Sequence, residues 1–426
     1  MPNREYFKNK KVTVVGLARS GVACANLLYR FGAQVSVTDI KDTPQSREAA
    51  SKLVSGEIKV ELGRHTPELI EQSDLIVLSP GVPLDSPCVK WAREFNKLLI
   101  SEIEAASILC PAKIIAVTGS NGKTTVTTLI GMILEAAGKK VFVCGNIGNP
   151  FSGEVEKMQE GDFVVLEVSS FQMETIKDFK PYLAVILNLT PNHLDRYHNL
   201  EEYLEAKKRI FMNQEAGDFL VLNGDDPLLS SAAAEARSKT VFFKKEAGRN
   251  PNQSAVAAVG NILGVGAGLM QKVFQEFKGL EHRMEEVALI NGVRFINDSK
   301  ATTADSAIWA ISNISSPVIL VAGGRHKGID YRVIIPASRG KVKYAFLIGE
   351  AKEIIASDLK DSGFAVEKAQ TLEEAVTKAL RQAKPGDSVL LSPMCSSYDM
   401  FKDYEERGRY FKKIVMELKQ KEDRHG

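Results

Sequence analysis

Short apolar runs rich in β-branched residues alternate with longer segments of helical periodicity along most of the chain. The runs are 11–16, 34–39, 74–81, 113–119, 140–146, 162–170, 182–190, 218–226, 317–324, 343–350 and 387–393. This alternation is typical of parallel sheets flanked by helices. Several runs end in Gly, Asp, Asn or Ser, and open α/β sheets bind ligands beyond the carboxyl ends of their strands. We therefore expect an α/β fold whose sites follow its strands.

The chain of 426 residues is too long for a single core, and its pattern divides into three parts. Segment 101–110 predicts a linking helix before a new strand, and segment 268–277 predicts a helix before a second boundary. Beyond that boundary, segment 285–298 predicts a hairpin, with Asn291 and Gly292 in a type I′ turn. The expected domains are 1–99, 100–279 and 280–426.

Composition narrows the class of protein without fixing its chemistry. The 55 basic and 53 acidic residues give a net charge of +2, so no global field favours nucleic acid or an anionic membrane. No apolar run reaches the length of a membrane span, and the first residues lack the apolar core of a signal peptide. The five cysteines lack C-x-x-C spacing and predict buried thiols of a reducing compartment. We expect a cytoplasmic monomer.

The stretch 118-TGSNGKTT-125 follows a predicted strand and opens a predicted helix. Gly119 and Gly122 allow backbone N–H groups to approach a phosphate, Lys123 adds a positive charge, and Thr124 can offer a hydroxyl to Mg²⁺. The usual longer phosphate loop would place a glycine where Val117 stands. A chance Gly-Lys-Thr in a turn is the alternative, but the position between strand and helix favours nucleoside triphosphate binding.

The stretch 12–28 resembles a dinucleotide fingerprint in which Ala18 replaces the second glycine, between Gly16 and Gly21. Asp39 ends the next strand at the distance expected of a ribose-binding carboxylate. NAD binding is one interpretation, and a turn that serves another nucleotide is the other.

Two further candidates follow strands close to the phosphate loop in sequence. Glu167 interrupts an apolar run, and a buried carboxylate needs either an ion pair or a metal. His193 follows the next strand, in 187-LNLTPNHLDRY-197, and is either a satisfied loop residue or a ligand. Lys207 and Lys208, on the predicted helix 200–211, have the positions of solvated cations of an amphipathic helix.

Three polar loops follow strands in the last third of the chain. They are 295-FINDSKATTADS-306, 320-LVAGGRHKGID-330 and 389-VLLSPMCSSYDMFKDYEERG-408. Any one of them could be a surface turn, but three at the ends of neighbouring strands predict a pocket for a small anion.

With these motifs together, the chain resembles the Mur ligase family of peptidoglycan synthesis. The resemblance extends over nearly the whole chain and is carried by GLARSG, SPGVP, TGSNGKTT, GNIGNP, LEVSSFQ, LNLTPNHLDRY, YLEAKKRIF, EHRME, INDSKAT, GGRHKG and LLSPMCSSYDMFKDYEERG. It implies a Rossmann-like N-terminal domain, a central P-loop ATPase-like parallel sheet and a C-terminal Rossmann-like α/β domain. The activity it implies is ATP-dependent amide ligation of D-glutamate to UDP-N-acetylmuramoyl-L-alanine through an acyl phosphate, without a nucleic-acid or membrane partner.

The resemblance also implies roles for individual residues. Those for ATP are Gly119, Ser120, Asn121, Gly122, Lys123, Thr124, Thr125, Asn252, Arg283, Asp298 and Lys300. Those for two Mg²⁺ ions are Thr124, Glu167, His193 and Lys207, the last as a carbamylated lysine. Those for the UDP-sugar substrate are Arg19, Ser20, Asp39, Ser79, Asn146 and His193. Those for D-glutamate are Thr302, Lys327, Ser397 and Tyr404.

The sequence departs from the family pattern at three points. The span from Asp226 to Asn250 looks short for the central domain, as though one or two peripheral strands were missing. The family's H-N-x-x-N motif is replaced by 250-NPNQS-254, so the adenine contact of Asn252 is in question. Tyr404 stands where a phenylalanine is frequent, so its backbone contact is expected to persist while its ring differs.

The sequence is also compatible with other functions. A sister ligase that uses another amino acid, or a folyl-polyglutamate synthetase, would share the central loop and the magnesium residues. The former often carries a D-N-P-R motif that is absent here, and the latter normally lacks a separate first domain. An NAD-dependent dehydrogenase would leave the phosphate loop unused, and a nucleotide-sensing module would not need Glu167, His193 and Lys207.

Overall fold

The computed structural model describes residues 3–190, 197, 199–246, 248–326 and 328–423. The chain divides into two compact units, Met1–Phe277 and Lys278–Gly426. The first unit contains two parallel sheets and the second unit contains one mixed sheet. The three-domain α/β architecture agrees with the sequence, while the domain boundaries remain predictions. No helix of the described residues combines the length and apolarity that a membrane crossing requires.

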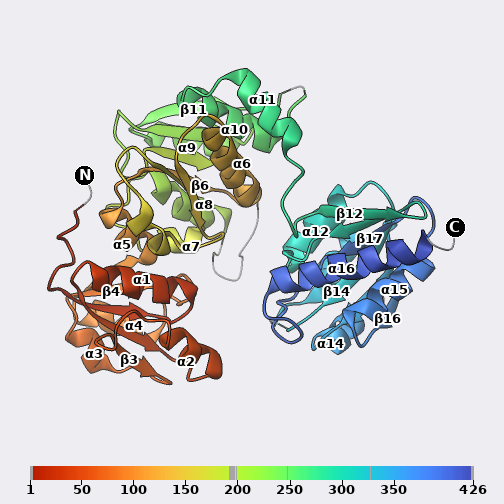
Figure 1. Ribbon diagram of the computed structural model, residues 1–426, viewed down its shortest axis with the longest axis horizontal. Helices are drawn as coiled ribbons and strands as arrows, with labels where there is room; N and C mark the ends of the chain where they lie inside the picture. Colours follow the sequence, from red (N-terminus) through yellow and green to blue (C-terminus); the bar gives the residue numbers. More distant parts are fainter. Residues whose placement is uncertain (1–2, 191–196, 198, 247, 327, 424–426) are drawn as a thin grey trace. The chain divides into compact units, whose positions relative to one another are not determined.

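The first sheet, whose strands β3 and β4 are labelled in Figure 1, has the order β3-β2-β1-β4-β5, with all strands parallel. Its strands are β1 (Lys11–Val15), β2 (Gln34–Asp39), β3 (Lys59–Leu62), β4 (Leu75–Leu78) and β5 (Leu98–Ser101). Its helices are α1 (Arg19–Arg30), α2 (Pro44–Ala50), α3 (Pro67–Glu71) and α4 (Pro87–Glu94). The strand order reverses between β1 and β4, which places the loops after these two strands side by side.

The second sheet has the order β11-β10-β9-β6-β8-β7 and is also parallel. Its strands are β6 (Lys113–Thr118), β7 (Val141–Gly145), β8 (Phe163–Glu167), β9 (Leu183–Ile186), β10 (Phe219–Asn223) and β11 (Lys239–Phe243). Its helices are α5 (Glu102–Leu109), α6 (Lys123–Ala136), α7 (Ser170–Met173), α8 (Leu200–Lys208), α9 (Pro227–Ala232), α10 (Pro251–Ile262) and α11 (Ala267–Glu276). Short 3-10 turns are η1 (Phe151–Gly153), η2 (Val155–Lys157), η3 (Arg209–Phe211) and η4 (Ala233–Glu235).

The two sheets of the first unit share one apolar core. Val12 and Val14 of β1 belong to the same buried cluster as Ala116 and Leu166 of the second sheet. Glu104 of α5 strengthens this junction, because its carboxylate accepts hydrogen bonds from the backbone N–H groups of residues 177–179 at 2.8–3.0 Å. The first two sheets therefore form one unit. A separate cluster, including Ile115 and Val117, fills the opposite face of the second sheet beneath α6 and α10.

The sheet of the second unit has the order β12-β13-β17-β14-β15-β16, in which only the β12–β13 hairpin is antiparallel. Its strands are β12 (Glu285–Ile290), β13 (Val293–Asn297), β14 (Val318–Gly323), β15 (Val342–Ile348), β16 (Ala365–Lys368) and β17 (Ser388–Leu391). Its helices are α12 (Ala304–Asn313), η5 (Tyr331–Ile334), α13 (Ile335–Ser338), α14 (Lys352–Asp358), α15 (Leu372–Gln382) and α16 (Tyr404–Glu422).

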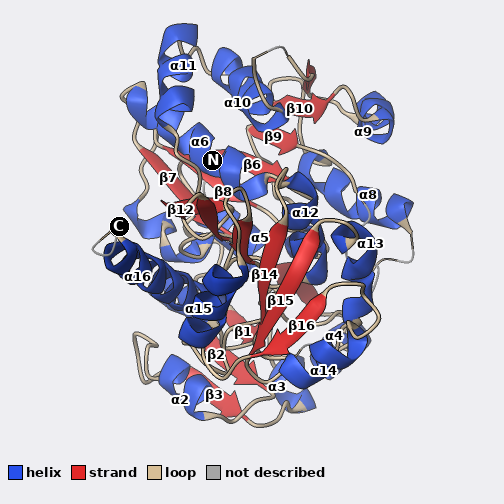
Figure 2. Ribbon diagram, turned by 90° about the vertical axis from the view of Figure 1, so that its right-hand side faces the viewer, coloured by secondary structure: helices blue, strands red, loops and turns tan. Residues whose placement is uncertain are grey.

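Helices cover both faces of this third sheet, as Figure 2 shows for the layers around β14 and β15. The predicted hairpin is confirmed, and Asn291 and Gly292 adopt φ angles of 49° and 77°, as a type I′ turn requires. Loops after β13, β14 and β17 leave the same edge of the sheet because these strands are parallel neighbours. All five cysteines are buried, as expected.

Candidate active site

The phosphate loop joins β6 to α6 in a conformation that depends on its glycines. Gly122 is the N-terminal cap of α6 with φ 84°, and Gly119 has φ 150°. A side chain at Gly119 would place its Cβ 2.9 Å from Cβ of Leu187. The ammonium of Lys123 donates to the carbonyl oxygens of Gly119 and Ser120 at 2.9 and 3.0 Å. The loop therefore has the backbone geometry and the cation of an anion cradle at a helix N-terminus.

The loop after β9 holds the phosphate loop in place. Asn188 accepts a hydrogen bond from the N–H of Asn121 at 2.8 Å and donates to its carbonyl oxygen at 3.0 Å. The N–H of Thr190 donates to Oγ of Ser120 at 2.9 Å. The chain that leads to residues 191–196 thus starts beside the phosphate loop. His193 itself lies outside the described residues.

Glu167 ends β8, next to β6, with 3% of its surface exposed. Asn146 donates from Nδ2 to one carboxylate oxygen of Glu167 at 2.9 Å. The other oxygen, Oε2, is buried without a hydrogen-bond partner in the described part of the chain. No ion pair of Glu167 occurs among the described residues, so the first of the two sequence-based interpretations is not supported. A buried carboxylate oxygen left without a donor is suited to a cation.

Lys207 differs from the solvated cation that its helix pattern predicted. Its side chain is 1% exposed, its Nζ donates to the carbonyl oxygen of Gly119 at 3.1 Å, and it lies 4.2 Å from the ring centre of Tyr203. Burial holds the pKa of Lys207 well below its usual value, and the charge of Lys123 lowers this pKa further. The expectation was wrong because the phosphate loop covers this face of α8. Lys208 has ordinary partners, Glu205 and Glu235.

Asn252 lies next to the phosphate loop despite the altered motif around it. A Cβ on Gly122 would be 2.4 Å from Oδ1 of Asn252, so the first turn of α10 reaches the N-terminus of α6. Thr124 and Ser120 are buried in the same region. The structure thus brings Asn252, Lys123, Glu167 and Lys207 together at the carboxyl end of the second sheet.

The first sheet carries a second group of expected residues at its topological switch point. Ser79 donates to the carbonyl oxygen of Gly16 at 2.9 Å, and Gly21 packs on that carbonyl so closely that a Cβ there would be 1.9 Å from it. Asp39 accepts from the N–H groups of Leu17 and Lys41 at 2.7 and 2.9 Å, so its carboxylate shapes the turn. Ser20 lies half-buried in the first turn of α1.

Arg19 connects this turn to the second sheet. Its guanidinium donates to the carbonyl oxygen of Gly148, in the loop after β7 that also holds Asn146. The two loops that were expected to contact one substrate are therefore joined directly.

Three comparisons with known proteins bear on this geometry. Family models match the Mur ligase MurD-like N-terminal domain at residues 10–101, the Mur ligase middle domain at 117–283 and the Mur ligase glutamate ligase domain at 282–395. The UDP-N-acetylmuramoylalanine--D-glutamate ligase of Thermoanaerobacter pseudethanolicus is 41% identical over 97% of this chain and 99% of its own. That of Geobacter sp. (strain M21) is 42% identical over 96% and 98%.

The chain belongs to the Mur ligase family. Solved structures show the same fold. The MurF ligase of Thermotoga maritima in complex with ADP matches with a TM-score of 0.59 and 18% identity, covering 98% of both chains. A pseudomurein peptide ligase type C from Methanothermus fervidus matches with a TM-score of 0.56 and 21% identity, covering 96% of this chain and 100% of its own.

In the second unit of this Mur ligase, Arg283 precedes β12, whereas the other described candidates follow β13 or β17. Asp298 is 4% exposed and accepts from Oγ of Ser392 at 3.0 Å and from the N–H of Met284 at 3.2 Å. Burial raises the pKa of Asp298 to about 7, against the opposing effect of these hydrogen bonds and of Arg283. Nζ of Lys300 lies 5.9 Å from the ring centre of Tyr404.

The D-glutamate candidates lie on the same edge of that sheet. Thr302 follows β13, Ser397 is buried in the loop after β17, and Tyr404 begins α16. The carbonyl oxygen of Tyr404 accepts from Oγ of Ser299 at 2.8 Å. Lys327, the fourth candidate, lies outside the described residues. Three of the four thus lie in the segments that follow β13 and β17.

Sequence reasoning missed two polar residues that organise these loops. Asn188 lies two residues after β9, and its place just beyond a strand could have marked it as a candidate. Arg407 is buried, but it lies in a strongly charged segment that gives no sign of this.

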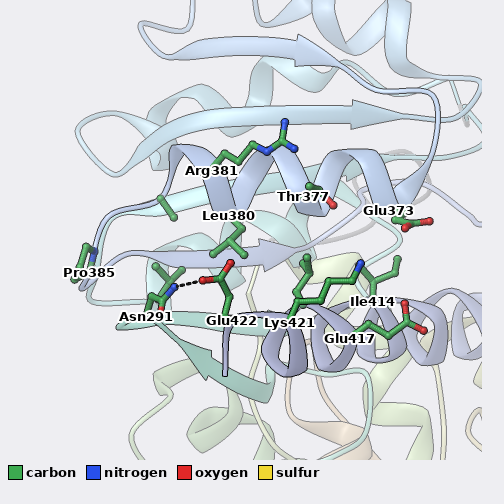
Figure 3. A pocket seen from close by; sticks show the side chains of 13 residues that line it. Asn291, Glu373, Thr377, Leu380, Arg381, Pro385, Ile414, Glu417, Lys421 and Glu422 are labelled. Atoms are coloured by element: carbon green, nitrogen blue, oxygen red, sulfur yellow. Dashed lines mark hydrogen bonds between the residues drawn. The ribbon is translucent and has the colours of Figure 1, made fainter. Parts of the chain in front are cut away.

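A pocket of about 600 Å³ between α15 and α16 is separate from all of these residues (Figure 3). Asn291 and Pro385, at one end of it, precede β13 and β17, whereas the candidate loops follow these strands. Asn291 donates to Glu422 there at 2.8 Å. None of the expected site residues lines this pocket.

Proposed function

We propose that this Mur ligase joins D-glutamate to UDP-N-acetylmuramoyl-L-alanine with the hydrolysis of ATP to ADP and phosphate. The observation that carries the proposal is the 41% identity, over 97% of this chain, to a relative named for that reaction. The geometry around Lys123, Glu167 and Lys207 is consistent with it. The reaction belongs to peptidoglycan precursor synthesis, and the enzyme is expected in the cytoplasm.

The first step of such a ligation transfers a phosphoryl group between two anions. The alanyl carboxylate of the substrate attacks the γ-phosphorus of ATP, a new C–O–P linkage forms, and ADP leaves. The backbone N–H groups of residues 123–125, in the first turn of α6, and the ammonium of Lys123 are placed to bind the phosphates and to offset the charge that develops there. Asn252, Arg283, Asp298 and Lys300 are the further proposed ATP contacts.

The residues present fit Mg²⁺. The unpartnered Oε2 of Glu167 is a hard oxygen ligand in a buried place, and the hydroxyl of Thr124 follows the phosphate loop. We assign Thr124, Glu167, His193 and a carbamylated Lys207 as the residues that would hold two ions. When bound, Mg²⁺ would neutralise phosphate charge and polarise the transferred group.

Carbamylation of Lys207 is consistent with its surroundings. A neutral amine reacts with CO₂ to form a C–N bond and releases one proton, which converts a cation site into an anion. Burial and the nearby Lys123 favour the neutral amine of Lys207, because both lower its pKa. The resulting carbamate would supply the carboxylate-like ligand that an unmodified lysine cannot.

The second step forms the amide bond. The deprotonated amine of D-glutamate attacks the acyl carbon, and phosphate leaves. We assign Thr302, Lys327, Ser397 and Tyr404 to D-glutamate, and Arg19, Ser20, Asp39, Ser79, Asn146 and His193 to the UDP-sugar substrate. Asn146 lies between the two groups of residues, since its Nδ2 bonds to Glu167 and its loop accepts a hydrogen bond from Arg19.

Phosphate release measured with ATP, UDP-N-acetylmuramoyl-L-alanine and a panel of D- and L-amino acids tests the proposal. We expect release that depends on D-glutamate, with a product heavier by one glutamyl residue in mass spectrometry. Preference for another amino acid would contradict the proposed acceptor but keep the chain in the family. Absence of release with every amino acid would contradict ligase activity.

A further inference from the structure

Arg407 is a buried cation in the first turn of α16, with 1% of its surface exposed. Its Nη2 donates to the carbonyl oxygen of Ser299 at 2.9 Å, and Nη1 and Nη2 both donate to that of Cys395 at 3.2 Å. Its Nε donates to Oγ of Ser299 at 3.0 Å. All of these acceptors are neutral.

No carboxylate among the described residues pairs with the charge of Arg407. Its guanidinium forms no ion pair within the described part of the chain, and the acidic groups whose charge opposes the effect of burial on its pKa are Cys395 and, after it, Asp399. Burial lowers the pKa of Arg407 to about 10, so the group stays protonated at neutral pH. Buried charges are usually paired, because an unpaired one is expensive to keep. A buried guanidinium that is kept without an ion-pair partner therefore indicates that its charge has a function.

The contacts of Arg407 converge on the three loops of the candidate amino-acid site. Ser299 lies on the loop after β13, three residues before Thr302, and Cys395 lies two residues before Ser397. Gly324, after β14, packs against the guanidinium, since a Cβ there would lie 3.2 Å from Nη1. Tyr404 lies one helical turn before Arg407. One side chain thus links every described segment assigned to D-glutamate.

We propose that Arg407 is the positioning residue that sets the specificity for an acidic amino acid. Its hydrogen bonds fix the loops, and its charge makes their common edge electropositive without binding the substrate directly. D-glutamate carries a net negative charge, whereas its neutral isostere D-glutamine does not. This inference rests on the proposed function, because it takes glutamate as the acceptor.

The expected size of the effect follows from Coulomb's law. A charge about 8 Å from a carboxylate, at an effective dielectric constant of about 20, changes affinity by about tenfold or more. A purely structural role would instead lower activity with D-glutamate and D-glutamine alike.

The test measures KM and kcat for D-glutamate, D-glutamine, ATP and the UDP-sugar substrate in Arg407→Met and Arg407→Lys. For Arg407→Met we expect KM for D-glutamate to rise about tenfold and the D-glutamate to D-glutamine ratio of kcat/KM to fall by a similar factor. Arg407→Lys keeps the charge and should recover much of that ratio. Arg409→Met, on the exposed face of the same helix, is the matched control and should retain it.

Asp399→Asn keeps the test decisive if Arg407→Met does not fold. Removing the acid that opposes Arg407 should lower KM for D-glutamate about twofold and raise the specificity ratio. Equal losses with both amino acids in Arg407→Met, or an unchanged ratio in Asp399→Asn, would overturn the inference. Wild-type protein that prefers another acceptor would overturn the proposed function instead, so the two failures are distinguishable.

Discussion

Among the described residues, each of the two units buries one lysine or arginine side chain behind the loops at the carboxyl ends of its strands, but the two differ in chemistry. Lys207 of the first unit and Arg407 of the second are both 1% exposed. Lys207 has a carbonyl oxygen at 3.1 Å and an aromatic ring beside it, whereas Arg407 donates to two carbonyl oxygens and a hydroxyl. Burial lowers the pKa of both, to about 10 for Arg407 and well below its usual value for Lys207.

The comparison shows that residue type, more than burial, decides what a buried cation can do. A lysine amine gives up its proton in such a place and becomes a nucleophile. A delocalised guanidinium keeps its proton and spreads its charge over several acceptors. The first unit thus has an amine of lowered pKa near the phosphate loop, and the second has a permanent charge near the loops after β13, β14 and β17.

Exchanging the residue type at position 207 gives the largest expected effect. Lys207→Arg keeps a long cationic side chain but removes the amine that reacts with CO₂, so kcat should fall about a thousandfold or more, as for the loss of a group that stabilises developing charge. Steady-state phosphate release measures this. Lys208→Arg is the matched control, because Lys208 pairs with Glu205 and Glu235 and should retain nearly full activity.

Near-normal turnover of Lys207→Arg would show that the reaction needs neither a neutral amine nor a carbamate at this position. The difference between Lys207 and Arg407 would then affect the stability of the fold and not the reaction. Circular dichroism of both variants separates loss of chemistry from loss of structure.

The sequence predicted most of the strands of the fold, but it did not predict the burial of Lys207 and Arg407. Its eleven apolar runs correspond to strands, but β3, β5, β11 and β16 were missed. Three of these, β3, β11 and β16, have mostly half-buried or exposed residues and lie at sheet edges, and β5 is a four-residue edge strand. Short edge strands lack the long apolar run that marks a buried one.

The candidate site was predictable where a motif fixes the local backbone. Glu167 ends β8, which pairs with β6, and Lys123 begins the helix that follows β6, as strand and motif predicted. The burial of Lys207 and Arg407 was not predictable, since each lies in a charged helical segment that resembles a solvated face. The contacts that bury them include residues far away in sequence, Gly119 for Lys207 and Ser299 for Arg407.

Removal of CO₂ should give the next largest effect. Protein equilibrated in CO₂-free buffer should lose about tenfold in activity and regain it on addition of bicarbonate, because the carbamate would be a metal ligand. Recovery should slow as the pH is lowered through the folded-state pKa of Lys207, since the protonated amine does not react. Labelled bicarbonate and ¹³C NMR detect the carbamate directly.

Lys207→Met serves as the control for this experiment, because it should show neither the carbamate resonance nor a response to bicarbonate. Full activity of the wild type without CO₂, together with no carbamate signal, would contradict the modification.

Lys207→Met is also expected to change the stability of the protein, by a smaller amount. Because the pKa of Lys207 is lower in the folded than in the unfolded protein, the unfolded state binds more protons between these two values, and stability rises with pH there. In CO₂-free buffer, Lys207→Met should raise the free energy of unfolding at pH 7 by about 1 kcal/mol or more, with the gain shrinking toward pH 10.

Trp91 of α4 lies in the first unit and Trp309 of α12 in the second, so each can report one unit. Urea titration of Lys207→Met in a Trp309→Phe background therefore follows the first unit. A gain that is constant from pH 7 to pH 10 would trace to packing and not to proton linkage.

The smallest expected effect concerns one hydrogen bond of Arg407. Ser299→Ala removes the hydroxyl that accepts from Nε at 3.0 Å and donates to the carbonyl oxygen of Tyr404 at 2.8 Å, but leaves the backbone acceptors of the guanidinium. The free energy of unfolding of the second unit, followed by Trp309 in a Trp91→Phe background, should fall by about 1 kcal/mol. Because the charge persists, KM for D-glutamate should change less than about threefold, and the preference over D-glutamine should stay. A collapse of that preference would mean that loop geometry, and not charge, sets Arg407 apart from Lys207.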